Sequence, residues 1–173
     1  CALTDEQMYN DYKTLADNIT AQLMLYNIKA TNHMSIPVEV VKRLSTHPNI
    51  VGLKDSGRDL ERMDACLAIS KNNPDFAYFC GWAAQSGNSL LKGADGIVPS
   101  TGNFTPERFA ELYNAAIAGN TDKANDLQRE TDAIARIYQE GRTPGQSLAA
   151  LKVMMHTKKL CQPWMLDPLT RLS

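Results

Sequence analysis

Residues 49–56 read Asn-Ile-Val-Gly-Leu-Lys-Asp-Ser, and this stretch decides the fold class. Pro48 bounds it on one side, and its apolar run has the length of a β-strand. A short, continuous apolar run between such boundaries favours a strand of a parallel sheet covered by helices. We therefore expect a parallel α/β protein in which Lys54 ends a strand.

Three similar runs extend this pattern through the first part of the chain. Strands are expected at 22–26, 76–79 and 94–98, and each alternates with a segment of helical spacing. Thr4 and Gln7 form a capping box, Pro37 suits the first position of a helix, and Asp59 suits an N-cap. Helices are predicted at about 5–19, 37–44, 60–72, 83–91, 105–119, 121–140 and 146–158, with a final turn or helix between Pro163 and Pro168.

Two architectures fit this alternation, an open doubly wound sheet and part of an eight-stranded barrel. Because parallel connections are right-handed, the carboxyl ends of all strands meet at one edge. A full barrel takes about 250 residues, whereas this chain has 173. A half-barrel alone would expose two sheet edges and an apolar interior.

Composition and residue spacing argue against nucleic acid, a membrane and a metal ion as partners. The net charge is −1 and the pI about 6.3, which argues against nucleic acid. No apolar run approaches the roughly 18 residues that span a membrane, and no leader peptide is expected. The cysteines lack CxxC spacing and the histidines lack metal-ligand spacing, so we expect reduced thiols in the cytoplasm and no metal. The residues concerned are Cys1, Cys66, Cys80, Cys161, His33, His47 and His156. The chain starts at Cys1 rather than methionine, so residues are expected to precede it.

Tyr26 and Lys54 are the candidate catalytic residues, because each ends a predicted strand. Neighbouring strands lie about 4.8 Å apart, so a phenol and an amine at adjacent strand ends can meet. Desolvation lowers the pKa of an amine and frees it to attack a carbonyl, and a phenol can relay protons. Asp55 and Asp59 are close enough in sequence to orient such a site, although Asp59 also suits a helix cap. The competing interpretation is a solvated loop lysine beside a packed tyrosine.

Two segments carry a resemblance to a known family. Leu25-Tyr26-Asn27-Ile28 resembles a Tyr-Asn-Ile/Val-Pro segment, and residues 49–56 resemble a Gly-Ile-Lys-Asp-Ser segment. Residues 93–98 and 100–103 resemble the last-strand segment of the same proteins. The chain is thereby similar to the dihydrodipicolinate synthase / N-acetylneuraminate lyase family of class I pyruvate-dependent aldolases, over its C-terminal half only.

The resemblance implies a fold and its division. It implies the C-terminal half of a TIM (β/α)8 barrel, with about four parallel strands and their helices, plus a C-terminal helical extension. Residues 1–104 would form the second half of the barrel, from its fourth helix to its eighth strand. Residues 105–173 would form the last barrel helix and the helical extension.

The resemblance also implies a chemistry. Lys54 would form a covalent imine with pyruvate or a related 2-oxo acid, and Tyr26 would shuttle protons, with neither metal nor organic cofactor. Substrate would be bound by the carbonyl of Val98 and by Thr31 and Asn103. The protein would be a lyase of the dihydrodipicolinate synthase type or the 2-keto-3-deoxy sugar acid aldolase type. Relatives that make dihydrodipicolinate usually carry an arginine at the position of Thr31, so the threonine favours a sugar acid aldolase or another lyase of the family.

The partners expected from the resemblance are a small-molecule substrate and a further protein chain. The family's carboxylate-binding Gly-Thr-Thr-Gly-Glu loop has no counterpart here. A homo-oligomer, or a complementary N-terminal half-barrel chain, is therefore expected. The alternative is a truncated, catalytically inactive half-barrel that acts only as an assembly module. Lys29 replaces the family's proline, and His33 stands at a glycine position, where it is expected to reshape the loop.

Overall fold

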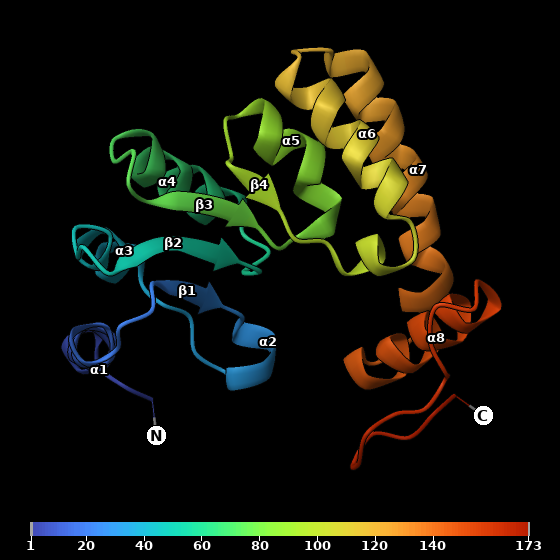
Figure 1. The fold of residues 1–173 in the computed structure, drawn as a ribbon, viewed down its shortest axis with the longest axis horizontal. Helices are drawn as coiled ribbons and strands as arrows, with labels where there is room; N and C mark the ends of the chain where they lie inside the picture. Colours follow the sequence, from blue (N-terminus) through green and yellow to red (C-terminus); the bar gives the residue numbers. More distant parts are fainter. Residues whose placement is uncertain (1, 173) are drawn as a thin grey trace. The chain divides into compact units, whose positions relative to one another are not determined.

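The computed structural model describes residues 2–172, so Cys1 lies outside the described residues. The chain divides into two compact units, residues 1–98 and 99–173, which we call the N-terminal and C-terminal units. Figure 1 shows the strands confined to the N-terminal unit and helices throughout. Among the described residues, no helix is both long and apolar enough to cross a membrane.

A parallel sheet forms the centre of the N-terminal unit, as the alternation of apolar runs predicts. Its strands follow one another in the order β1-β2-β3-β4, and every neighbouring pair is parallel. Their carboxyl ends therefore share one edge of the sheet. The strands are β1 (Leu23–Asn27), β2 (Ile50–Asp55), β3 (Ala77–Cys80) and β4 (Gly96–Ile97).

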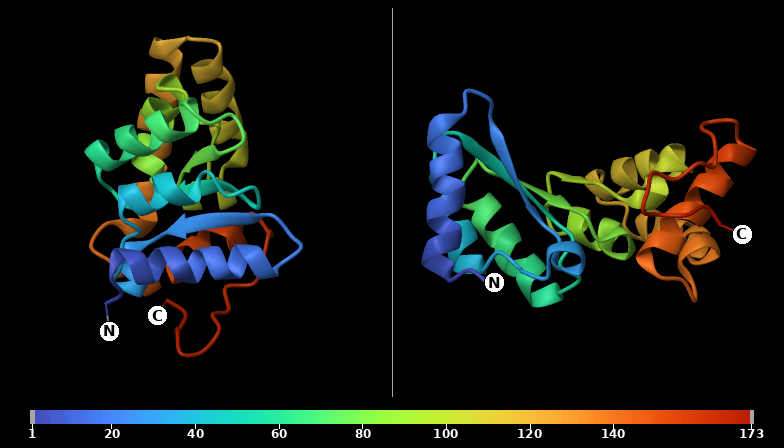
Figure 2. Two further views of the ribbon diagram at one scale, coloured as in Figure 1. Left: turned by 90° about the vertical axis from the view of Figure 1, so that its left-hand side faces the viewer. Right: turned by 90° about the horizontal axis from the view of Figure 1, so that it is seen from below.

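Helices α1, α3 and α4 gather on one side of this sheet (Figures 1 and 2). Beneath them lie Leu25 and Leu53, both 0% exposed, and Tyr78, 1% exposed. Successive strand residues point to opposite faces, so this buried row defines the covered face. The helices of the unit are α1 (Asp5–Asn18), α2 (Lys29–Asn32), α3 (Val38–Leu44), α4 (Leu60–Lys71) and α5 (Ser86–Leu91), with the 3-10 turn η1 (Ala83–Gln85).

The other face of the sheet, which we call the open face, carries the alternate residues of the strands. Met24 and Tyr26 of β1 are 42% and 41% exposed there. Lys54 and Phe79 occupy the equivalent alternate positions of β2 and β3 and are half-buried. The exposed apolar interior expected of a half-barrel is therefore present at this face.

Local signals place the helix starts correctly in two of three cases. The Thr4 capping box and the Asp59 cap, which accepts a hydrogen bond from the Arg62 amide, are confirmed. Pro37 is the N-cap of α3 and not its first helical residue, because its ψ of 146° is extended.

Two segments differ from the sequence prediction. The strand expected at 94–98 is shortened to Gly96–Ile97, and at its start Ala94 closes a turn after α5 through the Ala94 N–H to Ser89 carbonyl bond. The unpredicted helix α2 follows β1 and ends at His33, whose φ of 60° is left-handed. A side chain other than glycine therefore occupies the turn that the family resemblance assigns to glycine.

The C-terminal unit is helical. Its core contains Tyr138, Ala150 and Leu151, with Phe104 packed against them. Gly119, with a φ of 71°, ends the helix that begins at Pro106, as expected. The segment near Pro168 forms a turn, closed by the Leu169 N–H to Leu166 carbonyl bond. The elements are η2 (Ser100–Asn103), α6 (Pro106–Ile117), α7 (Thr121–Gln139) and α8 (Pro144–Thr157).

Candidate active site

The structure brings the two predicted catalytic side chains together at the carboxyl edge of the sheet. Tyr26 of β1 and Lys54 of β2 are direct partners in the strand register. The Lys54 Nζ lies 4.1 Å from the centroid of the Tyr26 ring. This distance is within the range of a cation–π contact, so the ring holds the amine near the phenol.

Both side chains point to the open face because of strand alternation. Leu25 and Leu53, one residue earlier, are completely buried on the covered face. Tyr26 is 41% exposed and Lys54 is half-buried. Strand alternation therefore puts the phenol and the amine on the open face, opposite the buried Leu25 and Leu53.

Phe79 is a neighbour of this pair that sequence reasoning missed. It is the register partner of Lys54 on β3, and Gly96 is in turn its partner on β4. A Cβ atom added to Gly96 would lie 2.7 Å from the Phe79 ring, so the glycine leaves room for that ring. The signal was available in the sequence, because Phe79 ends its strand run as Tyr26 and Lys54 end theirs.

Val98 and Thr31 lie in segments that follow strands at the same edge of the sheet. The Val98 amide donates to the Cys80 carbonyl at 2.8 Å, which continues the β3–β4 ladder past β4, and its side chain is 43% exposed. Thr31 is exposed in α2, and its hydroxyl donates to the Ile28 carbonyl at 3.2 Å. Asn103 belongs to the C-terminal unit, where its side-chain amide donates to the Ser100 carbonyl at 2.9 Å.

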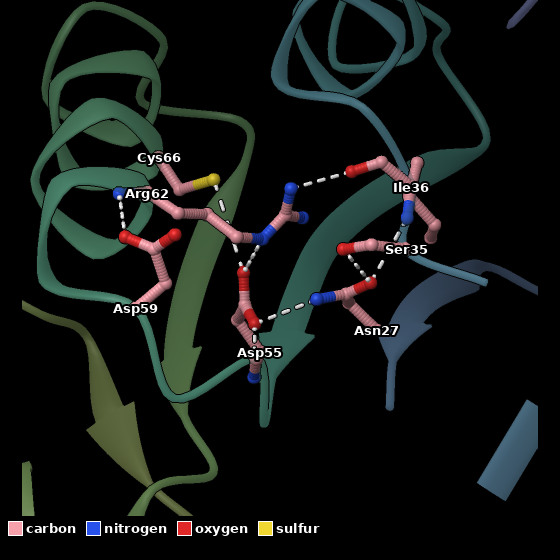
Figure 3. Close-up of polar contacts among 8 residues, drawn as sticks. Asn27, Ser35, Ile36, Asp55, Asp59, Arg62 and Cys66 are labelled. Atoms are coloured by element: carbon pink, nitrogen blue, oxygen red, sulfur yellow. Dashed lines mark hydrogen bonds and ion pairs between the residues drawn. The ribbon is translucent and has the colours of Figure 1, made fainter. Parts of the chain in front are cut away.

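The two acidic residues near Lys54 face away from its amine. Asp55 is 4% exposed, on the covered face, where it binds Asn27 and Arg62 (Figure 3). Asp59 caps α4, the second of the two roles considered for it. The reactive face of the pair therefore carries a phenol, an amine and apolar groups, with the acidic groups beneath the sheet.

Other reactive groups lack the geometry for chemistry. Burial raises the pKa of the Cys66 thiol to about 12 and also raises the pKa of Cys80. Neither thiol supplies a thiolate nucleophile near neutral pH. Within residues 2–172, no group of three or more His, Cys, Asp or Glu side chains could hold a metal ion.

Comparison with known sequences and structures places this site in context. The sequence model of the Dihydrodipicolinate synthetase family matches residues 2–173. A 4-hydroxy-tetrahydrodipicolinate synthase of Laribacter hongkongensis is 35% identical over 124 residues, which are 72% of this chain and 42% of that protein. An uncharacterised DapA-like lyase of Thermococcus kodakarensis is 29% identical over 161 residues, 91% of this chain and 53% of that one. The chain spans about half the length of the relatives it matches.

Solved structures agree with the strand order. A dihydrodipicolinate synthase from Bacteroides thetaiotaomicron has a TM-score of 0.91 and 26% identity, covering 99% of this chain and 58% of that one. The chloride-inhibited dihydrodipicolinate synthase from Acinetobacter baumannii, complexed with pyruvate, has a TM-score of 0.85 and 28% identity, covering 99% and 57%. The predicted partial (β/α)8 barrel, with its four parallel strands and helices, is confirmed.

Proposed function

We propose, since this chain belongs to the dihydrodipicolinate synthetase family, that it carries out Schiff-base chemistry of the class I aldolase type on pyruvate or a related 2-oxo acid. The observation that carries the proposal is the pairing of Lys54 and Tyr26 on the open face. Their register partnership and the 4.1 Å distance from the Lys54 amine to the Tyr26 ring centroid support the roles of nucleophile and proton relay that we assign to them.

The first step is imine formation. The neutral Lys54 amine attacks the C2 carbonyl of the 2-oxo acid; the nitrogen then loses one proton and the former carbonyl oxygen takes one up, which gives a carbinolamine. That hydroxyl is then protonated and leaves as water, and the nitrogen lone pair forms the C=N bond. We assign Tyr26 to give and recover these protons, and the contact of its ring with the lysine amine supports that role.

The second step uses the imine as an electron sink. Loss of a proton from C3 of the bound 2-oxo acid sends its electron pair through C2 to the iminium nitrogen and gives an enamine. The enamine carbon attacks the carbonyl carbon of an aldehyde, whose oxygen takes up a proton, and hydrolysis then releases the product and the free amine. The reverse sequence is aldol cleavage, so lyase and synthase activities share one site.

Substrate choice follows from two observations. The Acinetobacter baumannii structure contains pyruvate, which makes pyruvate the first substrate to test. Thr31 offers a hydroxyl and no positive charge beside the strand end that carries Tyr26. A polyhydroxylated aldehyde, as in a 2-keto-3-deoxy sugar acid, suits a neutral hydrogen-bonding group better than an anionic partner does. Val98, through its carbonyl, is the further substrate contact in this proposal.

A protein partner belongs to the same proposal. Met24, Tyr26 and Val98, which lie in β1 or directly after β4, are each more than two-fifths exposed. Apolar side chains gathered at a sheet face favour burial against another protein surface. A second copy of this chain, or a chain that supplies the complementary half of the barrel, would cover this face and exclude water from the amine.

Borohydride trapping tests the proposed function. The chain is incubated with pyruvate, reduced, weighed by intact mass spectrometry and mapped by peptide, with Lys54→Arg as the control that keeps the charge. We expect one reduced pyruvate adduct, on Lys54, that is lost in the variant. An adduct spread over exposed lysines such as Lys71 and Lys123, or none at all, would refute the proposal and favour the assembly-only interpretation.

A further inference from the structure

Figure 3 shows a polar network at the ends of β1 and β2, on the covered face of the sheet. Its centre is the side-chain hydrogen bond from Asn27 Nδ2 to Asp55 Oδ1, 2.9 Å long. Asn27 is 0% and Asp55 is 4% exposed. Burying an amide and a carboxylate is costly unless their polar atoms are paired, so the network is a specific arrangement and not a surface contact.

The Asp55 carboxylate is held from several sides. Its Oδ1 also accepts from the Gly57 amide at 2.7 Å, and its Oδ2 accepts from Arg62 Nε at 2.6 Å. Arg62 is 10% exposed and comes from α4, so the ion pair ties the end of β2 to a helix. Charge-assisted bonds of this kind are shorter and stronger than neutral ones. Asp55 therefore has little freedom to move away from the covered face.

Asn27 extends the network to the segment that follows α2. Its Oδ1 accepts from the Ile36 amide at 2.9 Å and from the Ser35 hydroxyl at 3.0 Å. Arg62 Nη1 donates to the Ile36 carbonyl, so the arginine that pairs with Asp55 also holds the far end of this connection. The loop between Asn27 and Ile36, which contains Thr31, is thereby closed at its base.

The network residues immediately follow the catalytic residues in both strands. Tyr26 pairs with Lys54 in the register, and Asn27 pairs with Asp55 at the next step. Because adjacent strand residues point to opposite faces, holding Asn27 and Asp55 on the covered face holds Tyr26 and Lys54 on the open face. A slip or twist of either strand end would need two buried polar groups to break their bonds.

We propose that Asn27, Asp55 and Arg62 are positioning residues that keep the Lys54 amine and the Tyr26 phenol in register on the open face. The inference rests on the proposed function for its catalytic meaning, but its structural content concerns where the Lys54 side chain points. It assigns no contact between these three residues and substrate. Their role is to act through the backbone of the strand ends.

If the network only stabilised the fold, its loss would change the reactivity of Lys54 no more than the loss of a similar bond elsewhere in β2 would. Asn49 supplies that matched control. Asn49 precedes β2 at its amino end, where its side-chain amide donates to the carbonyls of Ala16 and Ile19, both at 3.0 Å. Asn49→Ala thus removes an asparagine anchor of the same strand at the far end from Lys54. Asn27→Ala removes the asparagine anchor that lies beside Lys54.

The experiment measures Lys54 itself in the parent chain, Asn27→Ala, Asp55→Asn and Asn49→Ala. Each protein is labelled competitively with acetic anhydride and mapped by peptide mass spectrometry, with exposed Lys123 as the internal reference. Circular dichroism and urea titration select conditions in which every variant is folded. Arg62→Lys, which keeps the charge but offers fewer donors, replaces either network variant that does not fold.

We expect the labelling of Lys54 relative to Lys123 to rise about two- to fivefold in the network variants, the change that corresponds to loss of the ring contact. Asn49→Ala should leave the ratio unchanged. Trapping with pyruvate at Lys54 should fall about a hundredfold in the network variants, as expected for a misplaced nucleophile. Equal ratios in Asn27→Ala and Asn49→Ala would overturn the inference. No adduct in the parent chain would instead refute the proposed function, and the labelling ratio would still decide the positioning role.

Discussion

Replacing Gly52 with alanine tests the strand packing that places Lys54. A Cβ atom at Gly52 would lie 2.7 Å from the backbone oxygen of Ala77 on β3 and 3.2 Å from the Met24 methyl. Ordinary contact begins at 3.4 Å, so β2 and β3 would have to separate by about 0.7 Å. Ladder bonds of about 2.9 Å would then lengthen to about 3.6 Å, beyond the hydrogen-bond range.

The expected destabilisation follows from that separation. Losing about two ladder bonds, together with the strain of overpacking, costs roughly 2–3 kcal/mol, while alanine reduces the entropy of the unfolded chain by about 0.4–1 kcal/mol in its favour. The net loss in free energy of unfolding is about 2 kcal/mol. With a urea dependence of about 2 kcal/mol per molar, the midpoint should fall by about 1 M.

The assay is urea unfolding followed by tryptophan fluorescence in a Trp164→Phe background, where only Trp82 reports and therefore only the N-terminal unit is observed. Gly96→Ala is the matched comparison, because its Cβ would also meet a neighbour at 2.7 Å. That neighbour is the Phe79 ring, a side chain that can turn, so we expect a loss of less than about 1 kcal/mol. If Gly52→Ala costs no more than Gly96→Ala, the close approach of β2 and β3 is wrong.

Three further outcomes follow from particular residues. Tyr138→Phe removes a hydroxyl that bonds Thr101 at 2.8 Å in the core of the C-terminal unit, so the free energy of unfolding of that unit should fall by about 1–3 kcal/mol. Trp164 fluorescence in a Trp82→Phe background measures this loss, and an unchanged value would contradict the bond. Burial raises the pKa of the Cys66 thiol from 9.0 to about 12, so the stability that the protonated thiol contributes is complete below pH 9 and is lost as the pH rises toward 12. Alkaline urea titrations of the parent and of Cys66→Ala should converge over that range, and parallel curves would argue against burial. Tyr26→Phe keeps the ring beside the amine but removes the proton relay of imine formation. The rate at which borohydride traps the pyruvate imine on Lys54 should therefore fall about 10²- to 10⁴-fold, and trapping at the parent rate would exclude Tyr26 as the relay.

The sequence predicted those features that depend on neighbouring residues. Apolar runs of strand length and the alternation with helical spacing predicted the parallel sheet, and the Thr4 and Asp59 caps predicted helix starts, because each signal acts within a few residues. The position of Lys54 at a strand end was predicted for the same reason. The family resemblance added the partial barrel, which the structural comparison confirmed.

Contacts between distant segments were decided by the tertiary structure. The pairing of Tyr26 with Lys54 and the direction of Asp55 depend on the register of two strands, which covered-face packing and the Asn27–Asp55 bond set across 28 residues of chain. Phe79 is a neighbour of Lys54 only because β3 pairs with β2 in the sheet, which the sequence did not show. By itself, therefore, the sequence located the ends of β1, β2 and β3 to within one residue, since propensity and hydrophobic pattern are local. Only the folded sheet decided which of those residues meet and on which face, because register is set by long-range burial and hydrogen bonding.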